Sequence, residues 1–171
     1  MELFAILLVL VQDAPSVSGT WKLDPARSRI VNEVGWPGLI GAGAPERIHV
    51  TQAANGTVVI ESEINEGHAR IYKPGGPDTA TPVAQTGRIT MSSRWEGRTL
   101  VSIGELVSPA GESSTARETL TPGEDGLSMR IEIAPGPERA NASTLTYLRT
   151  SGVDPCEKWP TPCKPPEGKS K

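Results

Sequence analysis

Aromatic residues, cysteine and histidine are all scarce in this chain, and each shortage excludes something. Aromatic residues make up 4% of the 171 residues, and the single Phe is Phe4, so a core must be built mainly from Ile, Val, Leu and Met. The two cysteines have no histidine near them in sequence, which argues against a zinc site with its usual four ligands. The net charge of −3 comes without a basic stripe, so we expect no nucleic-acid binding.

Long apolar runs are absent except at the N-terminus. The run from Leu3 to Val11 in "MELFAILLVLV" is too short to span a bilayer as a helix, but it matches the apolar region of a signal peptide. Residues 1–14 are therefore interpreted as a signal peptide or apolar leader, although Glu2 stands where a positive charge is usual. The alternative is a buried or disordered N-terminal strand. On the first interpretation the protein is secreted or periplasmic, and it meets a membrane only through an uncleaved leader.

The two cysteines, Cys156 and Cys163, lie in a Pro- and Lys-rich tail over residues 152–171. In an exported chain an even cysteine count predicts a disulfide. Closing so short a loop stabilises the local chain by about 2–3 kcal/mol on the chain-entropy model. Free thiols and a metal site are the alternatives.

Glycine and proline are abundant, with 18 and 16 residues, which favours many turns and argues against a helical bundle. Between the turns, apolar and polar residues alternate with the period of a β-strand. The alternating segments are 20–23, 46–52, 57–63, 69–73, 88–95, 98–106, 114–120, 127–134 and 143–150. The long connection Pro25–Pro45 shows no such alternation, and residues 74–87 form a Pro- and Gly-rich stretch between two of the segments.

Strands joined in sequential order by tight turns favour antiparallel pairing of chain neighbours. We therefore predict an all-β fold over residues 18–151, a single antiparallel up-and-down barrel of about 8–10 strands, since closure leaves no exposed edge. The alternative is a β-sandwich, which needs longer crossovers than most of those present.

The first predicted strand lies in "SGTWKLDPARS" (Ser18–Ser28). Its "GTWKL" resembles the first-strand G-x-W signature of the calycins, the superfamily of lipocalins and fatty-acid-binding proteins. It also resembles small exported bacterial lipocalin-like proteins that begin "SGTWKLDP". The resemblance implies that Trp21 and Arg149 are structural, with the Arg149 guanidinium over the Trp21 indole where the first and last strands meet. A second lipocalin motif of the T-D-Y type is missing.

Apolar strand residues suggest what fills such a barrel. About eight strands enclose room for one small ligand, so Met91, Trp95, Met129 and Tyr147 are candidate ligand contacts. The alternative is that they collapse into a packed core. In the long connection, Trp36 and Leu39 are further candidate ligand contacts, as part of a lid over the barrel mouth. A surface patch for a partner and a plug of one barrel end are the alternatives.

Motifs for catalysis are thin. His49 and His68 are not accompanied by a G-x-S-x-G motif that would supply a nucleophilic serine. Glu61 and Glu63 lie on one strand face, and such a pair is more typical of a solvent-exposed face than of acid–base chemistry. No phosphate loop, dinucleotide fingerprint or zinc spacing predicts a cofactor or metal.

The expected function is an exported lipocalin-like binding protein for a small apolar or amphipathic ligand, without catalysis. A structural or protein-interaction module of the cell envelope is the alternative, and an enzyme of unknown class is the third. The sequence does not indicate an oligomeric state.

Overall fold

The computed structural model describes residues 14–31, 44–62, 69–83, 87–107, 110–135 and 142–150. Within these ranges the chain forms ten β-strands and one short 3-10 helix, η1 (Pro25–Arg27). The strands are β1 (Gly19–Leu23), β2 (Arg47–Gln52), β3 (Val58–Ser62), β4 (Arg70–Tyr72), β5 (Thr79–Val83), β6 (Gly87–Glu96), β7 (Thr99–Val107), β8 (Ser113–Pro122), β9 (Ser128–Pro135) and β10 (Ser143–Arg149). The described ranges contain no helix with the length and apolar character that crossing a membrane requires.

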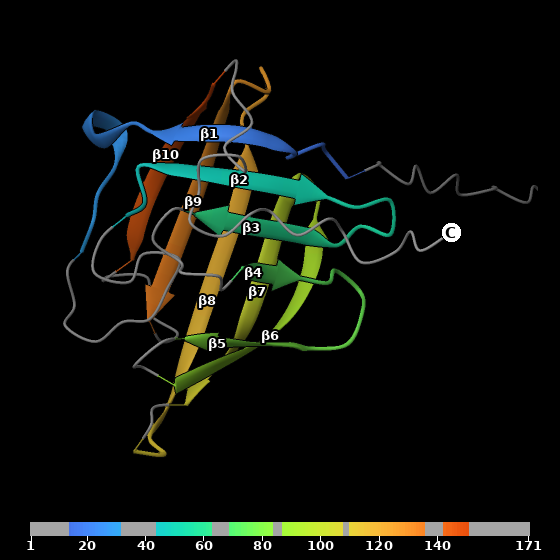
Figure 1. Ribbon diagram of the computed structural model, residues 1–171, viewed down its shortest axis with the longest axis vertical. Coiled ribbons are helices and arrows are strands. Elements are labelled where there is room, and N and C mark those ends of the chain that lie inside the picture. Colours follow the sequence, from blue (N-terminus) through green and yellow to red (C-terminus); the bar gives the residue numbers. More distant parts are fainter. Residues whose placement is uncertain are drawn as a thin grey trace, which may run out of the picture.

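All ten strands belong to one antiparallel sheet with the order β4-β3-β2-β1-β10-β9-β8-β7-β6-β5. Chain neighbours pair with each other, and β1 pairs with β10, so the first and last strands lie side by side. The sheet curls on itself into a nearly closed barrel (Figure 1). The predicted up-and-down barrel is thereby confirmed, and the sandwich is not what forms.

Strand pairing is interrupted between β4 and β5, the two ends of the sheet order. Side-chain and turn contacts hold these strands in place instead. The Thr79 hydroxyl on β5 donates to the Ile71 carbonyl on β4 at 2.8 Å, and the Gly75 N–H in the turn between them donates to the Ser93 carbonyl on β6 at 3.0 Å. These hydrogen bonds replace part of the missing ladder.

The strand β5 is the one that the sequence analysis did not predict. It lies in the stretch 74–87, whose glycines and prolines favoured a connection. Pro82 has no N–H to give to a ladder, but a strand at the edge of a sheet needs to pair on one side only. The other long connection, Pro25–Pro45, contains η1 and a bridge between Arg29 and Thr144, while residues 32–43 lie outside the described ranges.

The two ends of the barrel differ in their connections. One end, here called the tight-turn end, carries the turns β2–β3, β4–β5, β6–β7 and β8–β9. Each of these turns has a glycine at positive φ (Gly56, Gly75, Gly97 and Gly126), a conformation that side chains other than glycine rarely adopt. The opposite end, here called the loop end, carries the remaining connections, including the long one between β1 and β2.

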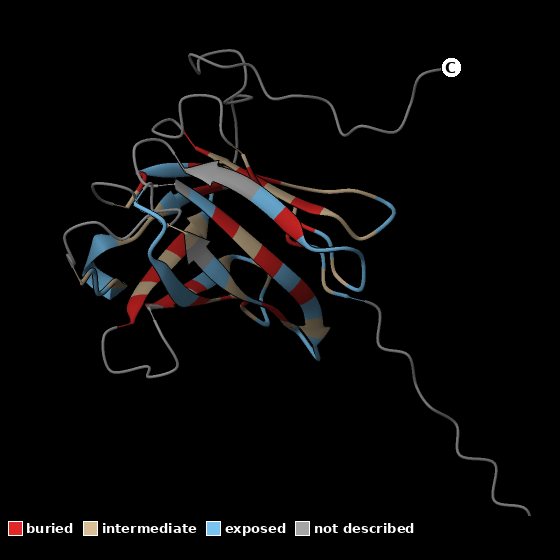
Figure 2. Cartoon of the chain, turned by 90° about the horizontal axis from the view of Figure 1, so that it is seen from below, coloured by how far each residue is buried: buried red, intermediate tan, exposed pale blue. Residues whose placement is uncertain are grey.

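Inside the barrel, alternate residues of each strand form the core, as the banded colouring of Figure 2 shows. On β3, for example, Val58, Ile60 and Ser62 are buried while the residues between them are half-buried. The fully buried large side chains are mostly aliphatic, with Trp21 and Tyr147 as the two aromatic exceptions. The scarcity of aromatic residues therefore leads to the Ile-, Val-, Leu- and Met-rich interior that composition predicts.

The barrel closes where β1 meets β10. Trp21 pairs with Arg149 in the strand register, and the Arg149 guanidinium lies 4.4 Å from the centroid of the buried Trp21 indole. The guanidinium also donates to the carbonyls of Ser18 and Gly126 at 2.9 Å each. Gly19 has φ +144°, and a Cβ at this position would lie 2.6 Å from Arg149 Nη1. The glycine of "GTW" therefore makes room for the arginine over the tryptophan.

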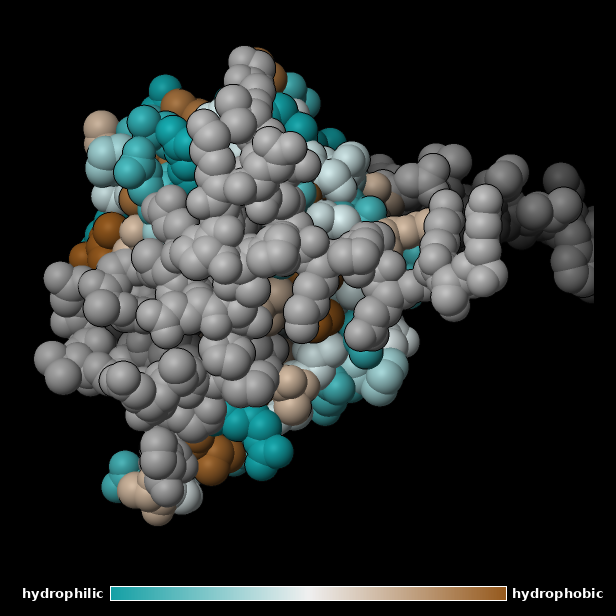
Figure 3. All heavy atoms as spheres, viewed as in Figure 1, coloured by the Kyte–Doolittle hydropathy of each residue, from teal (hydrophilic) through white to brown (hydrophobic). Residues whose placement is uncertain are grey.

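The outer surface carries few large apolar side chains in the described ranges. Those classed as exposed are Ile30, Ile71, Ile103 and Leu127, and they lie on four separate parts of the fold. On the face of the molecule that Figure 3 shows, the described residues are mainly hydrophilic, with small separate apolar patches. The exposed large apolar side chains of the described ranges are therefore scattered and do not gather into one patch.

Candidate functional site

The described interior contains two buried charged side chains, Arg70 and Glu118. Arg70 and Tyr72 are the first and last residues of β4, so strand alternation points both inward and turns Ile71 outward. Glu118 points inward from β8 between the buried Ala116 and Leu120. Because β4 and β8 are not neighbours in the sheet, these side chains meet across the interior. Arg70, Tyr72 and Glu118 are called the polar cluster below.

Both oxygens of the Glu118 carboxylate accept a hydrogen bond within the polar cluster. Arg70 Nη2 donates to Oε1 in an ion pair, and the Tyr72 hydroxyl donates to Oε2 at 2.7 Å. The exposed fractions of Arg70, Tyr72 and Glu118 are 5%, 4% and 2%, so solvent screens these contacts little. The three side chains form one charge-paired, hydrogen-bonded unit in a mostly aliphatic interior.

Burial and pairing set the protonation states of the donors. Burial by itself lowers the pKa of Arg70, but attraction to Glu118, with a smaller contribution from Tyr72, outweighs it and raises the pKa of Arg70 above its ordinary value. Burial also raises the pKa of Tyr72 well above its ordinary value, and the negative charge of Glu118 raises it further. At neutral pH Arg70 is therefore a cation and Tyr72 a neutral hydroxyl donor.

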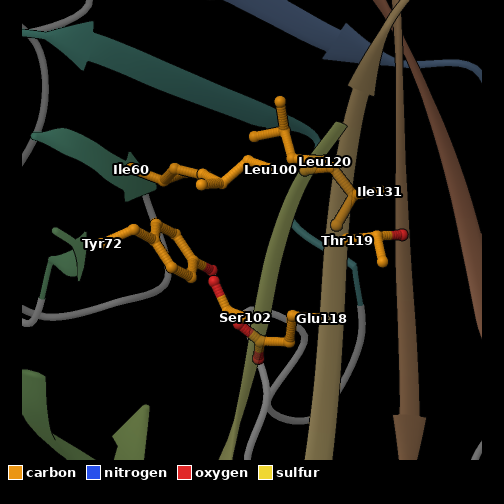
Figure 4. Close-up of a pocket in the computed structure, with 8 residues that line it drawn as sticks. All are labelled: Ile60, Tyr72, Leu100, Ser102, Glu118, Thr119, Leu120 and Ile131. Atoms are coloured by element: carbon orange, nitrogen blue, oxygen red, sulfur yellow. Dashed lines mark hydrogen bonds between the residues drawn. The ribbon is translucent and has the colours of Figure 1, made fainter. Parts of the chain in front are cut away.

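A small cavity adjoins the polar cluster (Figure 4). Its volume is about 10 Å³, which is room for about one water. One side is aliphatic, and on the other the Tyr72 hydroxyl points toward the Glu118 carboxylate near Ser102. The lining residues are Ile60, Tyr72, Leu100, Ser102, Glu118, Thr119, Leu120 and Ile131. The surface that faces the cavity is therefore mostly apolar, with the polar groups of Tyr72, Ser102 and Glu118 at its edge.

Two polar atoms beside the cluster have no hydrogen-bond partner. They are Arg70 Nε and Ser62 Oγ, and both are buried. Ile60 is the register partner of Arg70 across β3 and β4, so Ser62, two residues further on, is the diagonal neighbour of Arg70 on the inner face. Ser62 ends β3 and Arg70 begins β4, so both residues stand at the ends of their strands that face the loop end. Buried polar atoms without a hydrogen-bond partner are rare in folded proteins, so Arg70 Nε and Ser62 Oγ are candidates for hydrogen bonds to a ligand.

The predicted ligand contacts are distributed differently from this site. Met129 and Tyr147 are fully buried in the core, where the Tyr147 hydroxyl donates to the Pro45 carbonyl at 3.0 Å. Trp95 packs against the core near the tight-turn end, and its buried Nε1 has no partner. Met91 faces the interior from β6. None of these four lines the cavity.

Other sequence-predicted residues lie outside the described ranges. Among the ligand contacts these are Trp36 and Leu39, and the tail with Cys156 and Cys163 is also outside. His68 and Glu63 lie outside as well.

The histidine considered for catalysis, His49, is on the outer face of β2. Its Nδ1 lies 3.2 Å from the Thr20 hydroxyl, and its register partner on β3 is Glu61. Both side chains are half-buried and point away from the polar cluster. Within the described ranges, no group of three or more His, Cys, Asp or Glu side chains could hold a metal ion.

The sequence analysis did not single out the polar cluster, although a signal for it exists. In "ARETL", Glu118 occupies the same strand face as the apolar Ala116 and Leu120. In "RIY", Arg70 shares its face with Tyr72. A charged residue on the apolar face of a strand costs free energy unless it is paired, and this mismatch is the feature to look for.

A scan against protein-family models finds no match to this chain, and a comparison with curated proteins finds no relative.

Proposed function

We propose that this chain is an exported, calycin-like barrel that binds a small amphipathic ligand in its interior, with the polar cluster as the anchor. The ten-stranded up-and-down barrel and the packing of Arg149 over Trp21 are compatible with the calycin resemblance of "GTWKL". The proposal includes no catalysis.

The observation that carries the proposal is the burial of Arg70 and Glu118 inside a mostly aliphatic barrel. Taking two charges out of water costs several kcal/mol per ion in effective terms, about as much as their attraction returns. Well-packed apolar residues of the same volume often give equal or greater stability. Stability alone therefore does not account for the cluster, whereas a binding site needs a few placed polar groups among apolar walls.

The lining next to Glu118 favours a ligand on the side facing the loop end. On the inner face of β8, Ala116 lies two residues before Glu118 and nearer the loop end. Its cross-strand partner on β7 is Gly104, the partner of Gly104 on β6 is Met91, and the partner of Met91 on β5 is Thr79. Only Met91 has a large side chain, which keeps the predicted role of Met91 as an apolar contact. A ligand placed here meets the polar cluster with its head group and Met91 with its apolar part.

Binding must be accompanied by movement. The described cavity of about 10 Å³ admits about one water, so a larger ligand requires inner side chains to rearrange. We expect amide hydrogen exchange to slow in β3, β4 and β8 when ligand is added.

The binding proposal is tested with the full chain and the triple variant Arg70→Met/Tyr72→Phe/Glu118→Leu. Decan-1-ol, decanoate and decylammonium serve as probes, and binding is followed by Trp fluorescence and titration calorimetry. We expect saturable one-to-one binding of at least one probe and its loss in the triple variant, while circular dichroism shows the variant folded. Ser93→Ala is the matched control, because Ser93 is a buried polar residue bonded to Ser102 and not to the cluster. Absence of saturable binding by all three probes contradicts the proposal.

Export is a separate part of the proposal, supported by the apolar run at residues 3–11. Expression of the full chain in a bacterium, followed by cell fractionation and N-terminal sequencing, tests it. We expect a shortened chain outside the cytoplasm. Recovery of the intact chain in the cytoplasm contradicts this part and leaves the binding proposal standing.

A further inference from the structure

We infer that the head group of the ligand is an uncharged oxygen, as in an alcohol or a ketone, that accepts a hydrogen bond from Arg70 Nε and contacts Ser62 Oγ. This inference rests on the proposed function and adds the chemical class of the ligand. It follows from the charge balance of the interior and from the two unpaired polar atoms.

The charge of the site is already balanced. Arg70 contributes one positive charge and Glu118 one negative charge, and they are the two charged side chains buried in the described ranges. A carboxylate head group would leave the interior with an unpaired negative charge, and an ammonium group would leave it with an unpaired positive charge. An isolated buried charge is far more costly than a hydrogen-bonded neutral group. The charge balance therefore favours a neutral head group.

The hydrogen-bond inventory then selects oxygen. Arg70 can only donate, and its Nε has no acceptor. Each Glu118 oxygen already accepts one hydrogen bond, from Arg70 or from Tyr72, so the group left without any partner is the Arg70 Nε–H donor rather than the carboxylate. Ser62 Oγ can donate or accept, so it suits either a ligand hydroxyl or a carbonyl. An uncharged ligand oxygen satisfies both unpaired groups without disturbing the ion pair.

The position of these atoms fits a head group that enters from the loop end. Ser62 is the last residue of β3 and Arg70 is the first residue of β4, and both face the interior. The head group then lies on the side of the cluster nearer the loop end, while the small, mostly apolar cavity lies on the side of Tyr72, Leu100 and Leu120. The ion pair itself stays intact when the ligand binds.

The test compares the three ten-carbon probes on the full chain at neutral pH. We expect decan-1-ol to bind at least about tenfold more tightly than decanoate or decylammonium, because burying an unpaired charge costs more than a lost hydrogen bond. We also expect the affinity for decanoate to rise as the pH falls through the pKa of decanoate, because the protonated acid is neutral. Equal affinities, or a preference for decanoate at neutral pH, overturn the inference.

Two variants locate the head group. Ser62→Ala removes an unpaired buried atom, so we expect unchanged or higher thermal stability and an affinity for decan-1-ol reduced by about three- to tenfold. Ser93→Ala, the matched control, leaves the order of the three affinities unchanged. If Ser62 and Arg70 only hold solvent, Ser62→Ala leaves all three affinities unchanged, and that result overturns the inference.

The outcomes separate the two proposals. No binding of any probe overturns the proposed function, and this inference falls with it. Binding that is lost in the triple variant but shows no preference for a neutral head group overturns this inference alone.

Discussion

Replacing one member of the polar cluster is expected to change the stability of the protein very differently from replacing all three together. Glu118→Leu alone leaves the Arg70 guanidinium buried without a counter-charge and the Tyr72 hydroxyl without an acceptor. Removing one partner of a buried ion pair costs about 3–5 kcal/mol. For a chain of 171 residues each kcal/mol shifts the Tm by about 2–4 °C, so the Tm falls by about 6–20 °C.

The triple variant Arg70→Met/Tyr72→Phe/Glu118→Leu removes the whole cluster and keeps its approximate volume. Since apolar replacement of a buried ion pair is often neutral or stabilising by about 1–4 kcal/mol, we expect the triple variant to be at least as stable as the original chain. Urea unfolding followed by circular dichroism measures both variants, and an unchanged m-value shows that the unfolding reaction is the same. A triple variant as unstable as Glu118→Leu refutes the reasoning, because the cluster would then be needed for folding.

Three further predictions concern barrel closure and pH. Trp21→Ala is expected to lower stability by about 3–5 kcal/mol in urea unfolding while leaving the order of ligand affinities unchanged, since Trp21 is fully buried at the closure; a changed order would contradict its purely structural role. Gly19→Ala is expected to lower the Tm, because φ is +144° and the added Cβ would lie 2.6 Å from Arg149 Nη1; an unchanged Tm would contradict the assignment of Gly19 as the space for Arg149. The raised pKa of Tyr72 in the folded state means that its contribution to stability is present below the unfolded pKa of about 10 and is lost as pH rises above it. The stability of the original chain relative to Tyr72→Phe should therefore decrease above about pH 10 in urea unfolding, and a constant difference would contradict the burial of Tyr72 as a neutral donor.

Much of the fold could be predicted from the sequence because its signals are local. Alternation within "RIHVTQ" and the Asn55-Gly56 turn fix the β2–β3 hairpin without knowledge of the rest of the chain. β5 escaped because Pro82 and the surrounding glycines resemble a connection, and only its position at the edge of the sheet makes it acceptable as a strand.

The site could not be predicted in the same way because it depends on contacts between distant strands. Alternation puts Arg70 and Tyr72 on one face, but it does not say which face is inside. Glu118 lies on β8, which is not a sheet neighbour of β4, so no pairing rule relates them. The cluster appears only when the barrel closes and the two strands face each other across its interior.

The central claim is that the polar cluster anchors a ligand inside the barrel. Titration calorimetry of decan-1-ol into the full chain and into the folded triple variant tests it most directly. We expect a saturable isotherm with one ligand per chain for the original sequence and no measurable binding to the triple variant. Equal binding to both proteins would contradict the claim.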